Sequence, residues 1–151
     1  MLFHPGSAWR HGTVTERRTK QDFAHQMRDL VDGHFPDATL ISVVLDNLNT
    51  HPPASLYAPF ASAEAKRILN KREFRYTPNH GSWLNMAELE FAALQRQCLD
   101  QRVPSQADVV RDVAIWEAAR NRDKTTVTCP VWAYRLGDHP AAPLQRRSAM
   151  C

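Results

Sequence analysis

The chain has 151 residues, a formal net charge of +3 at pH 7 and a sequence pI near 9.0, which suit one globular domain that could contact a polyanion without requiring one. Its three cysteines, Cys98, Cys129 and Cys151, form no CxxC pair, so the sequence indicates neither a disulfide framework nor a zinc site. No apolar run reaches the roughly 18 residues of a membrane span and the start lacks the apolar core of a signal peptide, so we expect a soluble, cytoplasmic protein.

The start of the chain predicts one amphipathic helix. Residues 1–10 show no period, and residues 11–15 could form the end of a strand. Thr19 and Asp22 have the spacing of a capping box and precede an apolar stripe. We therefore expect a helix over residues 20–32 whose apolar side covers a sheet.

An aliphatic run over residues 40–45 predicts a buried strand, which ends at Asp46. The strand follows Pro36, which ends the first helix because a residue before proline is pushed out of the α region. Pro52 and Pro53 then force an extended departure, because proline fixes its backbone and lacks an N–H donor. We expect a loop there that is anchored by three apolar side chains, Leu56, Tyr57 and Phe60.

The middle of the chain predicts a helix and a second strand. Ser62 can cap a helix that runs to Leu69. Polar and apolar side chains alternate over residues 73–77, which favours a strand with one covered face. Pro78 then ends that strand.

Two further helices and a tail complete the expected order. Ser82 can cap a helix that runs to about Leu99 along one apolar stripe. Ser105 and Asp108 begin another capping-box helix, which fades near Asn121. The residues beyond Cys129 show neither the helical nor the strand spacing of apolar residues, which predicts a loose tail.

The alternation of strands and helices predicts an α/β domain, with a mixed sheet that carries helices on its faces. Asp46 would stand at the carboxyl edge of that sheet, where α/β proteins usually place their chemistry. Glu88 and Glu90 would lie on the helix that follows Ser82. Two carboxylates from distant segments suit a hard divalent cation such as magnesium, which prefers oxygen ligands.

Three segments closely resemble the bacterial insertion-sequence transposases of the Tc/mariner superfamily, which are DDE transposases. They are Asp-Asn-Leu-Asn-Thr-His at 46–51, the run at 74–90 that contains Thr-Pro-Asn-His-Gly-Ser-Trp-Leu-Asn-Met-Ala-Glu, and Leu-Gln-Arg-Gln-Cys-Leu at 94–99. Residues 14–20 and 22–24 also look like this family. The resemblance therefore divides the chain into an unassigned start at 1–12, a partial DDE catalytic domain at 13–122 and a divergent tail at 123–151.

The resemblance implies a ribonuclease-H-like fold in which three carboxylates bind two Mg²⁺ or Mn²⁺ ions. It assigns the second carboxylate to Asp46 and the third to Glu88, and Asn47 and His51 match the motif around the second. The implied reaction is DNA cleavage at the element ends by water, followed by attack of the freed 3′-hydroxyl on target DNA at a TA dinucleotide. A pair of metal ions suits this reaction, because the two ions contact the attacking and leaving oxygens of a phosphodiester displacement.

The sequence departs from the family at its start. The first carboxylate of the resembled fold lies on a strand that would precede Met1, and no helix-turn-helix region is present. None of the upstream aspartates is a credible substitute: Asp22, Asp29, Asp32 and Asp37. We therefore expect a fragment, either a degenerate remnant or one half of an element joined by ribosomal frameshifting to an upstream-encoded half, and no catalysis by the isolated chain.

Each acidic candidate also has a purely structural interpretation. Asp46 could make an Asx turn with Asn47, and His51 could be a solvent-exposed loop histidine. Glu88 and Glu90 could be charges favoured in the first turn of a helix. By angle Glu90 lies nearer the apolar stripe while the motif favours Glu88, and we follow the motif.

Five basic residues are candidates for contact with the DNA backbone, because phosphate recognition mainly requires positive charge. They are Arg17, Arg18, Lys20, Arg72 and Arg75. A solvated basic face is an equally good interpretation. The corresponding alternative function is a catalytically inactive remnant that binds DNA or forms a homodimer.

Overall fold

The computed structural model describes residues 1–46, 48–77, 86–125 and 148–150. Its elements in chain order are β1 (Leu2–His4), β2 (Trp9–His11), α1 (Lys20–Asp29), the π-helical turn η1 (Leu30–His34), β3 (Ile41–Leu45), the 3-10 helix η2 (Pro53–Tyr57), α2 (Ser62–Asn70), β4 (Arg72–Tyr76), α3 (Met86–Cys98), α4 (Gln106–Arg122) and β5 (Ser148–Met150). None of the helices in these ranges is long and apolar enough to cross a membrane.

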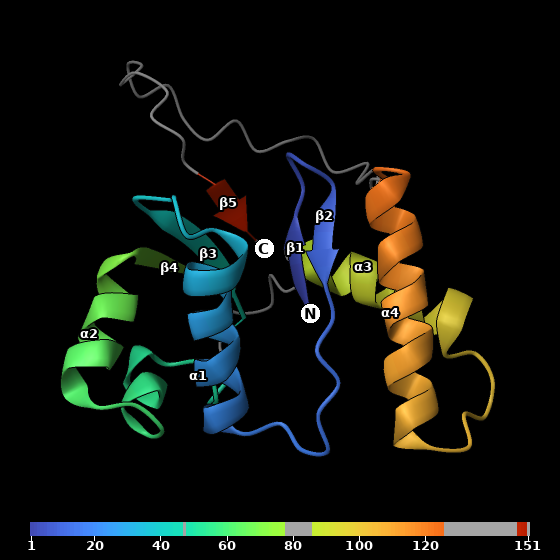
Figure 1. The fold of residues 1–151 in the computed structure, drawn as a ribbon, viewed down its shortest axis with the longest axis horizontal. Helices are drawn as coiled ribbons and strands as arrows, with labels where there is room; N and C mark the ends of the chain where they lie inside the picture. The colour runs from blue at the N-terminus through green and yellow to red at the C-terminus, as the bar shows by residue number, and fades with distance from the viewer. Residues whose placement is uncertain (47, 78–85, 126–147, 151) are drawn as a thin grey trace.

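The described strands form two small sheets. Strand β3 pairs in parallel with β4 along its whole length, from Ile41 beside Arg72 to Leu45 beside Tyr76. On its other edge β3 pairs in parallel with β5, and β1 and β2 form a separate antiparallel hairpin. Strand β5 lies between β3 and the hairpin (Figure 1) and also contacts β1. The prediction of an α/β domain is confirmed, but a parallel sheet and a separate hairpin replace the expected mixed sheet.

The larger core lies on one face of β3. Ile41, Val43 and Leu45 alternate with less buried residues, as a strand with one covered face requires. Helix α1, η2 and α2 cover this face and contribute the remaining buried apolar side chains, among them Phe23, Met27, Leu30, Leu56 and Ile68. The amphipathic stripe of α1 therefore packs on the sheet as predicted, and Asp46 is delivered at the end of a buried strand.

A second core joins α3 to α4. It contains Ala93 and Leu94 of α3 and Val113 and Trp116 of α4. Trp116 Nε1 donates a hydrogen bond to Gln97 Oε1 at 2.9 Å, which satisfies the polar atom of this largely buried indole. Helix α3 also contacts β1 and α4 contacts β2, so the hairpin lies against both helices.

Two predicted helix caps are confirmed and one is wrong. The Thr19 side chain accepts a hydrogen bond from Asp22 N–H and Asp22 accepts from Thr19 N–H, which completes a capping box, and Ser105 accepts from Asp108 N–H. Helix α2, however, has Ala61 at its N-cap without a side-chain hydrogen bond, so Ser62 does not cap it. The cap proposed at Ser82 lies outside the described residues.

Two short elements differ from the expectation. The start forms the β1–β2 hairpin, where no strand period is visible because each strand has only three residues. The tail contributes β5, which was expected to have no regular structure and which forms by pairing with the distant strand β3. The remainder of the predicted tail, residues 126–147 and 151, lies outside the described residues.

Candidate active site

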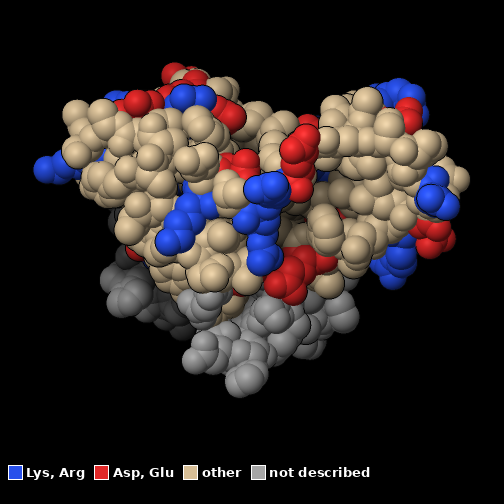
Figure 2. Space-filling view, turned by 90° about the horizontal axis from the view of Figure 1, so that it is seen from below, with Lys and Arg blue, Asp and Glu red and all other residues tan. Residues whose placement is uncertain are grey.

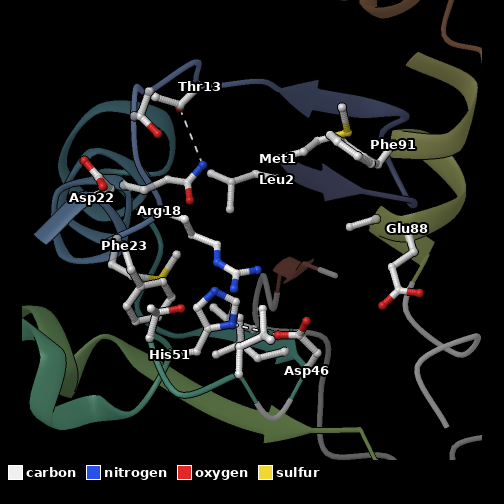
Figure 3. A pocket seen from close by; sticks show the side chains of 18 of the residues that line it. Met1, Leu2, Thr13, Arg18, Asp22, Phe23, Asp46, His51, Glu88 and Phe91 are labelled. Atoms are coloured by element: carbon white, nitrogen blue, oxygen red, sulfur yellow. Dashed lines mark hydrogen bonds and ion pairs between the residues drawn. The ribbon is translucent and has the colours of Figure 1, made fainter. Parts of the chain in front are cut away.

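A cavity of about 540 Å³ opens beside the carboxyl end of β3. Asp46 and His51 lie on one wall, Glu88 and Phe91 of α3 on another, and the segment that enters α1 on a third (Figure 3). Residues that are far apart in the sequence therefore converge on one space. Three of the four residues predicted for the catalytic site line it, and the fourth, Asn47, lies outside the described residues.

Asp46 and His51 form a defined pair in this cavity. His51 Nδ1 donates to Asp46 Oδ1 at 2.7 Å, because an ionised carboxylate can only accept. The imidazole lies 4.8 Å from the Phe23 ring, and Tyr76 Oη donates to the His51 carbonyl at 3.2 Å. Both side chains of the pair are partly exposed, at 28% for Asp46 and 21% for His51. The pair is held in place by packing while its carboxylate still reaches solvent.

Glu88 and Glu90 lie on opposite sides of α3. Glu88 is exposed and belongs to the cavity-lining side, whose other members are Ala87, Phe91, Ala92 and Gln95. Glu90 is completely buried, and its carboxylate lies 3.0 Å from both Arg10 Nε and Arg120 Nη2. Of the two glutamates, only Glu88 faces Asp46 across the cavity.

A family model for the DDE superfamily endonucleases matches residues 1–110 of the chain. The chain belongs to this family. No curated protein and no solved structure matches it. The match spans Asp46, His51 and Glu88, so the cavity lies within the part of the chain that matches the family. An endonuclease of this family implies cleavage chemistry on DNA.

The cavity contains two carboxylates of the kind that a divalent metal ion prefers. Asp46 and Glu88 are carboxylates, the donors that Mg²⁺ and Mn²⁺ prefer, and they come from different walls. Within the ranges that the structure describes, however, no group of three or more His, Cys, Asp or Glu side chains is close enough together to hold a metal ion. The residue types fit the expected ion, although the described residues do not bring three such side chains together.

Asp22 also lines the cavity, but it is committed to a helix cap. Its Oδ2 accepts hydrogen bonds from Thr19 N–H at 2.7 Å and from Thr19 Oγ1 at 2.6 Å. These hydrogen bonds hold the pKa of Asp22 below its usual range. Asp22 therefore has one carboxylate oxygen in structural use, which gives a physical reason not to treat it as a substitute for the first carboxylate.

Arg18 is a cavity residue that the sequence placed only among candidate DNA contacts. Its side chain extends into the cavity toward the wall that carries His51 and Asp46 (Figure 3). Thr13 and Thr15 line the same space. The apolar residues before α1 have no regular spacing from which this placement could be predicted. The placement of Arg18 depends on the path of the chain past the end of β3.

The other basic candidates of the DDE endonuclease are on the surface, with one exception. Arg17, Lys20 and Arg75 are exposed, and Arg75 Nη2 lies 3.1 Å from Glu73 Oε1. Figure 2 shows acidic side chains next to basic ones on the face seen from below, so no single-sign patch covers that face. The DNA-binding role of these residues stays a prediction.

Arg72 is the exception, because its side chain is buried with only 7% exposed. Its Nε donates to the Ile68 carbonyl at 3.1 Å and its guanidinium lies 5.0 Å from the Phe74 ring centre. Burial lowers the pKa of Arg72 to about 10, and its Nη1 and Nη2 atoms have no hydrogen-bond partner. Arg72 is thus misassigned as a surface contact for phosphate.

Replacing Arg72 by methionine is expected to leave the free energy of unfolding unchanged or to raise it by about 1 kcal/mol, because a buried, incompletely paired cation is replaced by an apolar chain. Urea unfolding at pH 7 measures this change. Arg75→Met is the matched surface control and is expected to change stability by less than about 0.5 kcal/mol. A loss of several kcal/mol in Arg72→Met would contradict the expectation.

Proposed function

We propose that the chain is the part of a DDE transposase catalytic domain that supplies two of its three metal-binding carboxylates. Asp46 acts as the second carboxylate and Glu88 as the third, in a ribonuclease-H-like domain of the bacterial insertion-sequence, Tc/mariner type. The observation that carries this proposal is the convergence of Asp46 and Glu88 on one cavity together with His51. The parent reaction is metal-dependent cleavage of DNA and strand transfer.

The side chains of the cavity have distinct parts in this proposal. Asp46 and Glu88 would hold Mg²⁺ or Mn²⁺, and His51 would orient the Asp46 carboxylate through its hydrogen bond to Oδ1. When bound, such ions supply Lewis-acid polarisation of the scissile phosphate and lower the pKa of a water nucleophile. Arg18, which reaches into the cavity, is placed to contact a DNA phosphate.

The remaining carboxylate would come from a segment outside the described residues or from a second polypeptide, such as an upstream-encoded half. The described residues bring together fewer than three such ligands, which also favours a second function, a non-catalytic remnant that binds DNA or forms a homodimer. The two functions differ in what they require of the cavity. Only the first depends on the carboxylates of Asp46 and Glu88 for binding a divalent ion.

Titration of the chain with Mn²⁺, followed by electron paramagnetic resonance of the free ion, tests the proposal. Asp46→Asn and Glu88→Gln are each expected to weaken Mn²⁺ binding at least tenfold, the order of loss found when a metal site loses a supporting group. Asp37→Asn is the control, because Asp37 is an exposed carboxylate away from the cavity. If the parent and the three variants all bind Mn²⁺ equally well, the catalytic proposal is wrong and the non-catalytic remnant remains.

A further inference from the structure

We infer that Glu90 is the positioning residue for Glu88, because its two ion pairs with Arg10 and Arg120 fix the rotation of α3 at which Glu88 faces the cavity. The consequence of this positioning for metal binding rests on the proposed function of Asp46 and Glu88. The fixed rotation of α3 itself is a property of the fold.

The contacts of Glu90 join three elements. Its Oε2 lies 3.0 Å from Arg10 Nε of β2, a close ion pair whose direction is not that of a hydrogen bond. Its Oε1 accepts a hydrogen bond from Arg120 Nη2 of α4 at 3.0 Å. Arg10 and Glu90 are both completely buried and Arg120 is 13% exposed. Glu90 is therefore held by charges from two sides.

Arg10 is itself fixed to α4. Arg10 N–H donates to Asn121 Oδ1 and Asn121 Nδ2 donates to the Arg10 carbonyl, each at 2.9 Å, and Arg10 Nη2 donates to the Thr125 carbonyl. Arg120 of α4 contacts α3 at a second residue, because its Nη1 also donates to Gln97 Oε1 at 3.3 Å. The hairpin and α4 thus form one frame that presents two positive charges to α3.

The spacing of the two glutamates connects this frame to the cavity. Successive residues of an α-helix are about 100° apart, so Glu88 and Glu90 point about 200° apart around α3. When Glu90 points into the frame, Glu88 points away from it, which is the side that lines the cavity. A rotation of α3 that carried Glu88 off the cavity would also pull Glu90 away from its arginines.

Apolar packing alone would fix this rotation less sharply. Ala93 and Leu94 are the apolar residues of α3 that are buried on the frame side, and apolar contact is non-directional. A buried carboxylate instead loses its compensation as soon as it leaves its partners. Burial lowers the pKa of Arg10, and the neighbouring charge of Glu90 offsets part of this effect.

Distances between spin labels measure the position of α3 without any metal. Labels are placed at Gln21→Cys on α1 and at Arg96→Cys on α3, both exposed positions, with the native cysteines replaced by alanine. Glu90→Gln is expected to broaden or shift the distance distribution. Glu117→Gln is the matched control, because it removes a carboxylate charge from α4 while the glutamine oxygen can still accept the hydrogen bond that Gly12 N–H donates at 2.7 Å, so that the frame is kept. Its distribution is expected to equal that of the parent.

Arg120→Gln serves as a second variant, because it removes one ion pair from the more exposed partner and disturbs folding less. It is expected to broaden the distribution in the same direction as Glu90→Gln. Mn²⁺ affinity is expected to fall about tenfold in both variants and to stay unchanged in Glu117→Gln. A distribution that stays sharp and unshifted in folded Glu90→Gln and Arg120→Gln would overturn the inference. Failure of the parent to bind Mn²⁺ through Asp46 would instead count against the proposed function alone.

Discussion

Replacing Glu90 by glutamine is expected to lower the free energy of unfolding by about 3–5 kcal/mol, which is a large fraction of the stability of a domain of this size. The change removes the negative charge that faces Arg10, whose side chain is completely buried. Arg10 would then be an uncompensated buried cation, and Arg120 would lose its charged acceptor. Urea unfolding at pH 7 measures the loss.

Replacing the whole cluster by apolar side chains tests whether the stability lost in Glu90→Gln comes from leaving a buried charge without its partner. Arg10→Met, Glu90→Leu and Arg120→Leu together leave no buried charge unpaired, so most of the stability lost in Glu90→Gln should return. The hydrogen bonds of the Arg10 main chain to Asn121 do not depend on the replaced side chains. A Glu90→Gln protein that loses less than about 1 kcal/mol would show that the buried ion pairs are not required.

Leu56→Ala is expected to cost about 2–5 kcal/mol, whereas Tyr57→Ala is expected to cost less than about 0.5 kcal/mol. The two residues are adjacent in η2, but Leu56 is completely buried in the larger core and Tyr57 is 47% exposed. Truncating Leu56 leaves a cavity beneath α1, which contacts η2. The difference between the two midpoints of urea unfolding measures the effect, and equal losses would contradict this assignment of the core.

The elements that pack on the sheet could be predicted from the sequence because their signals are local. The capping box at Thr19, the alternating strand at β4 and the aliphatic run before Asp46 each depend on residues within a few positions of one another. The predicted end of α1 is less exact, because the α-helix gives way to a π-helical turn before Pro36. Helix α2 also began without its expected serine cap.

The features that the sequence did not predict depend on distant partners. Strands β1 and β5 are too short to show a period, and β5 exists only through its pairing with β3. Arg72 has the composition of a surface residue, and only the packing of its strand against the core reveals that it is buried. Arg18 enters the cavity because of the path of the chain before α1.

The candidate site was predicted in part. The family resemblance favoured Glu88 while the helical angle favoured Glu90, and the structure gives each signal its own meaning. Glu90, which lies nearer the apolar stripe, is buried in an ion-pair cluster, whereas Glu88 faces the cavity. A glutamate near the apolar stripe of a helix therefore indicates a buried carboxylate that needs a cationic partner. The sequence alone does not show which arginines supply that partner.

The pairing of β5 with β3 has a consequence for the order of folding. Strand β3 obtains its second neighbour only when residues 148–150 have been synthesised, roughly a hundred residues after β3 itself, and such distant contacts form slowly. Until then one edge of β3 has unpaired N–H and C=O groups, which can pair with an extended segment of another chain. Synthesis and refolding at high concentration should therefore favour association through this edge, and low concentration should favour the pairing of β3 with β5.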